Sequence, residues 1–185
     1  MRKLITTFII AALLPALATA NPASEAHIQA LIETIHSDPD GSVADALLDD
    51  ADMPRIAHFV LGKYSREVSE EEVSVFAGRL ESFLRDFLAQ RSEELSSAHL
   101  EILSSVERSN TDSIVTTRVS TPFRDPMNMR WRLLERDGSW RLVDVEVHGL
   151  WLAIEQRAQV VAALSRPGTS VSSIYPSENL TSGID

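Results

Sequence analysis

The sequence predicts an α+β fold in which an antiparallel sheet of about four strands packs against several amphipathic helices. Two patterns predict it. Up to about residue 91, apolar residues recur at spacings of three and four, whereas from about residue 100 they alternate with polar residues. The chain has 185 residues, of which 44% are hydrophobic, so it can form a sizeable core. We expect a single domain over 21–175 and a disordered tail over 176–185.

The first twenty residues, MRKLITTFIIAALLPALATA, have the form of a secretory signal peptide. A basic start precedes an apolar run and a small-residue cleavage sequence that ends at Ala20. A membrane anchor is disfavoured because the run is shorter than the ~20 residues of a spanning helix, and because Pro15 interrupts it. Since the chain contains no cysteine, it can form neither a disulfide nor a lipid anchor on cysteine. We therefore expect a secreted soluble protein that begins at Asn21.

The charge of the chain excludes some partners. Removal of residues 1–20 takes away two basic residues and no acidic ones, which leaves 15 basic and 27 acidic residues and a formal charge of −12. A surface this acidic is repelled by nucleic acid and by anionic membranes. No nucleic-acid partner is expected, although the charge also serves ordinary solubility.

Three short helices are predicted before residue 68. Ser24 is the expected N-cap of the first, and residues 42–48 form the second. Asp52 caps the third, which has Pro54 in its first turn and Gly62 near its end. The first helix has one apolar stripe, formed by Ile28, Leu31, Ile32 and Ile35.

The longest predicted helix spans residues 70–91. Ser69 and Glu72 have the spacing of a capping box at its start. Its apolar face is unusually aromatic and consists of Val73, Phe76, Leu80, Phe83, Leu84, Phe87 and Leu88. Such a stripe on its own is more often ordinary core than a binding surface.

Strand patterns occupy residues 100–147. Alternation marks 100–106 and 127–133, and a β-branched run marks 114–120. The turn sequence 136–139 predicts a hairpin that places 140–147 antiparallel to 129–135. In the last strand the apolar set changes phase near Leu142, which predicts a bulge there.

The sequence contains no motif of a cofactor-dependent or hydrolytic enzyme. Its five histidines lack metal-ligand spacing, and it has no nucleophile elbow, phosphate-binding glycine loop or dinucleotide fingerprint. One carboxylate, Asp144, lies inside a valine-rich strand, where it must be paired or hydrogen-bonded. It is either a catalytic base beside His148 or, as the resemblance described next favours, a structural group paired with a cation such as Arg157.

The stretch 140–164, WRLVDVEVHGLWLAIEQRAQVVAAL, contains the pattern W-x-x-x-D-V-x-V-x-G followed by a helix with Arg157. Together with MPRIAHFVLGKY and SEEEVSVFAGRLESFLRDFL, it resembles the soluble periplasmic phospholipid-binding component of the Mla/Ttg2 (toluene tolerance) lipid transport family. The resemblance covers about 53–174. It implies a periplasmic, monomeric carrier without cofactor or metal. Such a carrier moves phospholipid, or a related lipid, between an inner-membrane ABC transporter assembly and an outer-membrane lipoprotein complex.

In this family the sheet and helices do not close completely, and lipid tails fill the gap. The resemblance, combined with the apolar faces, gives these candidate lining residues: Val60, Leu61, Phe76, Leu80, Phe83, Leu84, Met129, Trp131, Val145, Val147 and Leu150. It also implies structural roles for Asp144, Gly149 and Arg157, with Gly149 at a strand-to-helix junction that needs a positive φ or close packing. Two alternatives remain: a small secreted isomerase or hydrolase that uses Asp144 and His148, and an interaction module whose interior is only core.

Overall fold

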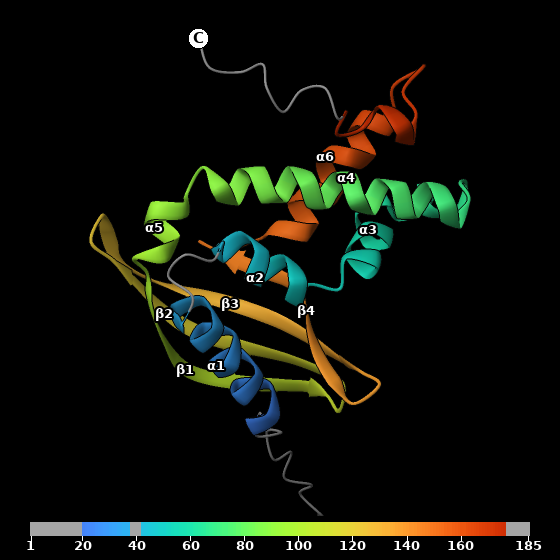
Figure 1. Ribbon diagram of the computed structural model, residues 1–185. Coiled ribbons are helices and arrows are strands. Elements are labelled where there is room, and N and C mark those ends of the chain that lie inside the picture. Colours follow the sequence, from blue (N-terminus) through green and yellow to red (C-terminus); the bar gives the residue numbers. More distant parts are fainter. Residues whose placement is uncertain (1–19, 38–41, 177–185) are drawn as a thin grey trace, which may run out of the picture.

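A computed structural model describes residues 20–37 and 42–176 (Figure 1). The predicted tail, apart from Pro176, and the predicted signal peptide, apart from Ala20, lie outside these residues. The elements are α1 (Pro22–Ser37), α2 (Val43–Asp50), α3 (Met53–Leu61), η1 (Gly62–Arg66), α4 (Glu70–Ala89), α5 (Ser92–Ser96), β1 (His99–Ser109), β2 (Asp112–Thr121), β3 (Arg124–Arg136), β4 (Ser139–Val147), β5 (Leu150–Trp151), α6 (Leu152–Leu164) and η2 (Val171–Ser173). The predicted α+β class is confirmed. None of the described helices is long and apolar enough to cross a membrane.

Two of the three predicted N-caps, Asp52 and Ser69, are confirmed, and Ser42 also caps a helix. Ser42 and Asp52 accept hydrogen bonds from backbone N–H groups of α2 and α3, and Ser69 forms a complete capping box with Glu72 at the start of α4. The prediction for Ser24 is wrong. Helix α1 begins two residues earlier, where Pro22 occupies its first turn and the Asn21 side chain accepts the Ser24 N–H at 2.9 Å.

The sheet is an antiparallel meander in the order β1-β2-β3-β4-β5. Met129 pairs with Val147 and Glu135 pairs with Trp140, as the predicted hairpin requires. The register shifts by one residue between Arg132 and Leu133, where β4 continues from Asp144 to Leu142, and this is the predicted bulge. One strand was not predicted, the two-residue β5 that pairs with the end of β4.

The turn between β4 and β5 explains the position of Gly149. Val147 pairs with Leu150, so His148 and Gly149 form a two-residue hairpin turn, and both have positive φ (52° and 80°). A Cβ on Gly149 would meet nothing within 4 Å, so the turn conformation requires glycine there and close packing does not. The chain therefore makes a hairpin before it enters α6.

The buried side chains form two clusters rather than one. The sheet cluster contains Ile28, Leu31, Ile32, Val115, Trp131, Leu133 and Leu142, and it joins α1 to the inner face of the sheet. The helical cluster contains Leu48, Met53, Ala57, Val60, Leu61, Val73, Phe76, Ala77, Leu80, Val160, Leu164 and Val171. Helix α2 contributes to both, because Leu48 belongs to the helical cluster while Ala46 and Leu47 pack on the sheet cluster.

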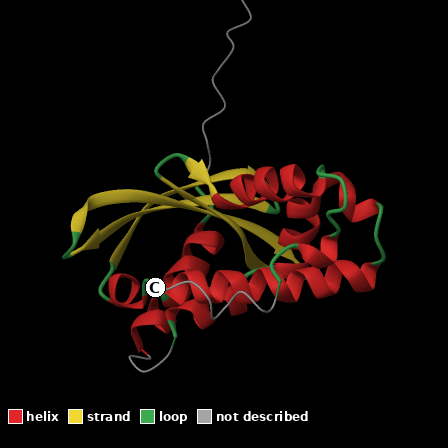
Figure 2. Ribbon diagram, turned by 90° about the horizontal axis from the view of Figure 1, so that it is seen from above, coloured by secondary structure: helices red, strands yellow, loops and turns green. Residues whose placement is uncertain are grey.

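The long helix α4 stands away from the sheet. It packs on α2, α3 and η2, and none of its extensive contacts is with a strand. Figure 1 shows α4 across the top of the molecule with α2 between it and the sheet, and in Figure 2 most helices gather on one side of the strands. Helices α2, α3 and α6 therefore separate α4 from the inner face of the sheet.

Candidate functional site

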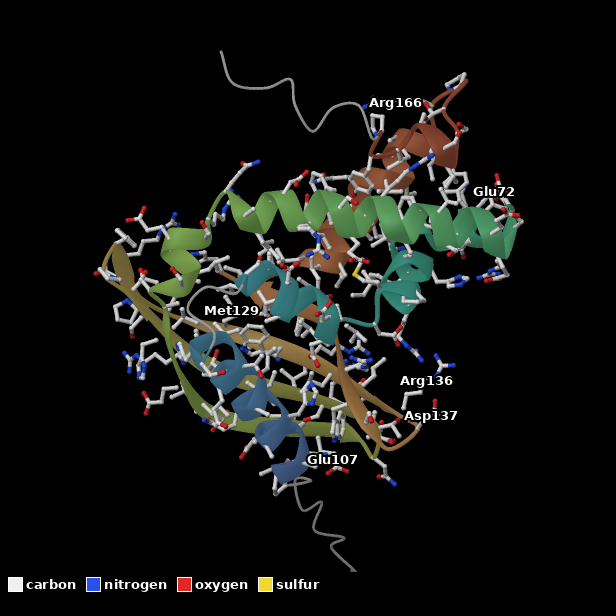
Figure 3. The ribbon with its side chains drawn as sticks, in the orientation of Figure 1. Glu72, Glu107, Met129, Arg136, Asp137 and Arg166 are labelled. Carbon is white, nitrogen blue, oxygen red and sulfur yellow. The ribbon has the colours of Figure 1, made fainter. Side chains whose placement is uncertain are left out.

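The inner face of the sheet carries a row of apolar residues that becomes more exposed toward β5. Trp131 pairs with Val145 across β3 and β4, Met129 pairs with Val147, and Val147 pairs with Leu150. Residues paired in this way lie on the same face. Trp131 is only 5% exposed, whereas Met129, Val145 and Val147 are partly exposed and Leu150 is 60% exposed. Met129 lies on the side of β3 that faces the helices (Figure 3).

The outer face of the same strands is polar. Arg130 pairs with Glu146 at 2.7 Å, and Arg132 makes two hydrogen bonds to Asp112 at 3.0 and 3.2 Å. Among the described strands, the row of apolar residues at this end of the sheet therefore lies on the inner face.

Partly exposed apolar residues also lie on the second half of α4. Leu84 and Leu88 pack at the edge of the helical cluster, and Phe87 is 41% exposed. Phe83 has another partner, because its ring stacks on Tyr175 with ring centroids 4.7 Å apart. Leu84 is consequently the predicted lining residue of α4 that is best placed to contact a ligand.

Five of the eleven predicted lining residues are deeply buried core residues. Val60, Leu61, Phe76 and Leu80 belong to the helical cluster and Trp131 belongs to the sheet cluster. The indole N–H of Trp131 donates to the hydroxyl of Thr117 at 2.9 Å, so this side chain is fixed in position. The structure brings the predicted residues together in two groups on either side of α2, not in one continuous wall.

Two open pockets lie on the helical layer. One of about 410 Å³ lies between η1 and α6, lined by Lys63, Ile154, Arg157, Ala158 and Val161. The other, of about 170 Å³, lies between α4 and η2 and includes Phe76 and Arg79. Phe76 is the only predicted lining residue among the residues that line these two pockets.

Asp144 caps α6 from the neighbouring strand. Its Oδ1 accepts the N–H of Ala153 at 2.9 Å and the N–H of Val145 at 2.8 Å. Burial raises the pKa of Asp144, while these two hydrogen bonds and the charge of Arg132 act in the opposite direction. Trp151, at the N-cap position, offers no side-chain acceptor, so the carboxylate supplies the missing cap.

The predicted ion pair between Asp144 and Arg157 is wrong. The Arg157 guanidinium lies over the ring of Phe59, 5.0 Å from its centroid, and it contacts the space beside Gly62 where a Cβ would sit, at 3.2 to 3.3 Å. Arg157 therefore packs α6 against the end of α3 and η1. Asp144 still joins the last helix to the sheet, but through a backbone N–H.

The geometry offers little to the enzymatic alternative. Asp144 makes no hydrogen bond or ion pair with His148 in the described part of the chain, and His148 lies in the tight turn after β4. Within residues 20–37 and 42–176, no group of three His, Asp or Glu side chains is arranged to hold a metal ion.

Comparison with known families identifies the family of the chain. The family model for the MlaC protein matches residues 26–172. The chain belongs to the MlaC family. The resemblance found in the sequence is thereby confirmed, and the MlaC match begins well before residue 53, where the quoted motifs start.

A solved structure shares the fold of this chain. The phospholipid-binding protein from Ralstonia solanacearum, determined in complex with a phospholipid, superposes with a TM-score of 0.63 at 18% sequence identity. The alignment covers 80% of the present chain and 88% of the Ralstonia chain. No curated protein sequence gives a significant match.

Proposed function

We propose that this MlaC-family protein is a noncatalytic periplasmic carrier. It binds the acyl chains of a phospholipid, or of a related lipid, and shuttles the lipid between an outer-membrane lipoprotein complex and an inner-membrane ABC transporter assembly. Membership of the MlaC family and the fold shared with a phospholipid-binding protein support this proposal.

The separation of the two apolar clusters is the structural observation that supports lipid binding. Most domains pack two, occasionally three, layers of secondary structure around one hydrophobic core. Here α4 packs on other helices, and partly exposed apolar residues remain at the edges of both clusters, Leu84 on one side and Met129 on the other. Acyl chains that enter between α4 and the open end of the sheet would cover these residues.

The energetics of lipid in water make such a carrier necessary. Exposure of an acyl chain costs about 0.8 kcal/mol per CH₂ group, so a chain of roughly 16 carbons carries a penalty of about 12 kcal/mol. A protein that covers most of that chain removes most of the penalty. Recognition then depends mainly on tail volume, and the head group stays near solvent.

Organic extraction of protein purified from the periplasm tests carriage. We expect mass spectrometry to find co-purified phospholipid or a related lipid in stoichiometric amount. Labelled phospholipid should also move chemically intact from donor to acceptor vesicles when the protein is added. Folded protein that contains no lipid and transfers none would refute the proposal.

A matched pair of substitutions tests the location of the site. Val147→Glu places a carboxylate on the inner face, whereas Val106→Glu places one on β1, where the neighbouring Ser105 faces α1 and Val106 is 40% exposed. An unpaired buried polar group costs about 1–3 kcal/mol, and 1.4 kcal/mol is a factor of ten in affinity. We expect Val147→Glu to weaken lipid binding about tenfold and so to lower the lipid load, and Val106→Glu to leave the load unchanged. Equal loads in two folded variants would remove Val147 from the site.

Export is part of the same proposal. The precursor expressed in a bacterial host should appear in the periplasmic fraction with the intact mass of a chain that begins at Asn21. A retained segment from Met1 to Ala20 would contradict it.

A further inference from the structure

The backbone nitrogen of Asn21 lies in a buried polar site between α1 and β1. Asn21 is only 9% exposed, and its N–H donates to the hydroxyl oxygen of Ser105 at 2.7 Å. The Ser105 hydroxyl in turn donates to Oε1 of Glu25 at 2.6 Å, so one hydroxyl group separates the nitrogen from a carboxylate. Ser105 itself is buried, at 6% exposure.

Further hydrogen bonds hold this site rigidly. The hydroxyl of Ser24, which is fully buried, donates to the carbonyl oxygen of Asn21 at 2.9 Å and shares a hydrogen bond of 2.7 Å with the hydroxyl of Ser113 on β2. The Asn21 side chain accepts the N–H of Ser24. The start of α1 is thus bonded to β1 through Asn21 and Ser105 and to β2 through Ser24 and Ser113, and these hydrogen bonds satisfy the buried polar groups.

We propose that Ser105 and Glu25 form a binding site for the α-ammonium group that processing creates on Asn21. The inference rests on the export proposed above, and it is independent of lipid binding. Hydrolysis of the Ala20–Asn21 peptide bond consumes one water molecule. Its hydroxyl goes to the carbonyl carbon of Ala20 and a proton goes to the nitrogen of Asn21, which becomes a primary amine and takes up a further proton from solvent.

The site suits an ammonium better than an amide. A backbone N–H needs one acceptor, and Ser105 already provides it, whereas an ammonium has three donors and a charge. A positive charge at the N-terminus of α1 opposes the helix dipole unless an acidic group is near. Glu25 stands in the first turn of α1 and, among the residues that the structure describes, its side chain is bound to a neutral hydroxyl and to no cation. The carboxylate is therefore in place before the charge that it neutralises.

The composition of the chain permits a direct test. Its lysines are Lys3 and Lys63, so a mature chain that begins at Asn21 has two amines, the α-amine and the exposed Lys63. The full precursor is exported from a bacterial host with its own signal. The purified product is then treated with limiting acetic anhydride at neutral pH, and peptide mass spectrometry gives the two acetylation rates.

The control variant carries one glycine inserted between Ala20 and Asn21. After cleavage its free amine is one residue farther out, and Asn21 again has an amide N–H for Ser105. We expect the wild-type α-amine to react at least about ten times more slowly than the amine of the insertion variant. A rise of one unit in the pKa of the α-amine would alone give this factor, because only the neutral amine reacts. The Lys63 rate should be equal in both, and denaturant should abolish the difference.

Substitutions in the site should release the α-amine. Glu25→Gln and Ser105→Ala should each accelerate its acetylation, whereas Glu33→Gln, which changes an exposed carboxylate on the same helix, should not. Circular dichroism identifies any substituted variant that does not fold. The comparison of the wild type with the insertion variant does not depend on these substituted variants. Equal α-amine rates in these two folded proteins, or a mature chain that does not begin at Asn21, would overturn the assignment. The lipid content of the same preparations reports on the carrier function separately.

Discussion

Substitutions of Asp144 can separate a structural carboxylate from a catalytic one. Asp144→Ala removes the oxygen that accepts the N–H groups of Ala153 and Val145, whereas Asp144→Asn keeps an oxygen in that place and removes only the charge. The two variants therefore report separately on the helix cap and on the charge.

The structure sets the expected magnitudes. Loss of a helix cap costs about 1 kcal/mol, in a range of roughly 0.5–2 kcal/mol, and an unsatisfied N–H adds to this, so Asp144→Ala should lower the free energy of unfolding by about 1–3 kcal/mol. Because burial raises the pKa of Asp144, its charged form is less stable in the folded protein than in water. We therefore expect Asp144→Asn to cost less than about 1 kcal/mol, the scale of one helix-dipole interaction.

Urea denaturation of the three proteins between pH 3 and pH 7 measures these terms. A carboxyl whose pKa is raised above its ordinary value of 3.8 holds its proton more tightly in the folded state. The resulting stabilisation is complete below pH 3.8 and is lost as the pH rises through the raised pKa. The wild type should thus lose stability relative to Asp144→Asn over this range. Equal destabilisation by Asn and Ala would refute the capping role, and enzyme-dependent lipid turnover that disappears in folded Asp144→Asn would refute carriage.

Two further predictions concern packing and turn geometry. Gly149→Ala should lower the free energy of unfolding by about 1–2 kcal/mol because an L-residue is strained at φ 80°, whereas Gly78→Ala, in the exposed face of α4 with free space around it, should raise it by about 0.5–1 kcal/mol. Chemical denaturation distinguishes the two, and a neutral Gly149→Ala would remove the turn argument. Trp131→Phe leaves the buried hydroxyl of Thr117 without its donor and should cost about 1–3 kcal/mol, measured by the same method. A cost near zero would show that the hydrogen bond is unimportant.

Local signals in the sequence were sufficient for most elements. The predicted caps Asp52 and Ser69 and the turn at 136–139 act on their own neighbours, so a short window contains the whole signal. Ser24 failed for the opposite reason. It has the chemistry of a cap, but its hydroxyl bonds to Ser113, 89 residues away, and only the folded sheet reveals that partner.

The sequence predicts which face of a helix or strand is apolar, but not which residues of that face line a site. Periodicity puts Phe76, Leu80 and Leu84 on one stripe of α4, and the structure confirms that all three pack on the helical cluster. The depth of each residue depends on what the other layers cover, and this is not a property of the stripe. Leu80 is fully buried and Leu84 is not, although they are one turn apart.

The hydrogen-bond partner of Asp144 could not be predicted from the sequence either. A cation at Arg157 satisfies the requirement that a buried carboxylate be paired. The predicted hairpin offered a nearer cation, because Arg132 on β3 is the register partner of Asp144. A backbone N–H satisfies it equally well, but only once the β4–β5 hairpin brings the start of α6 beside the strand. The two-residue turn His148–Gly149 was the available clue, because a glycine at its second position is typical of such hairpins.

The exposure of apolar residues at one end of the sheet has a thermodynamic consequence for a carrier. Burial of apolar surface yields about 25 cal/mol per Å², so covering Leu150, which is 60% exposed, and the partly exposed Met129 and Val147 would add stability. A protein that leaves this surface partly uncovered gives up that stabilisation, and a bound acyl chain restores it. Ligand that binds only the folded state stabilises it in proportion to the logarithm of its concentration over its Kd. The lipid-loaded protein should therefore unfold at a higher temperature than the delipidated one, and Val147→Glu should reduce that difference while Val106→Glu preserves it.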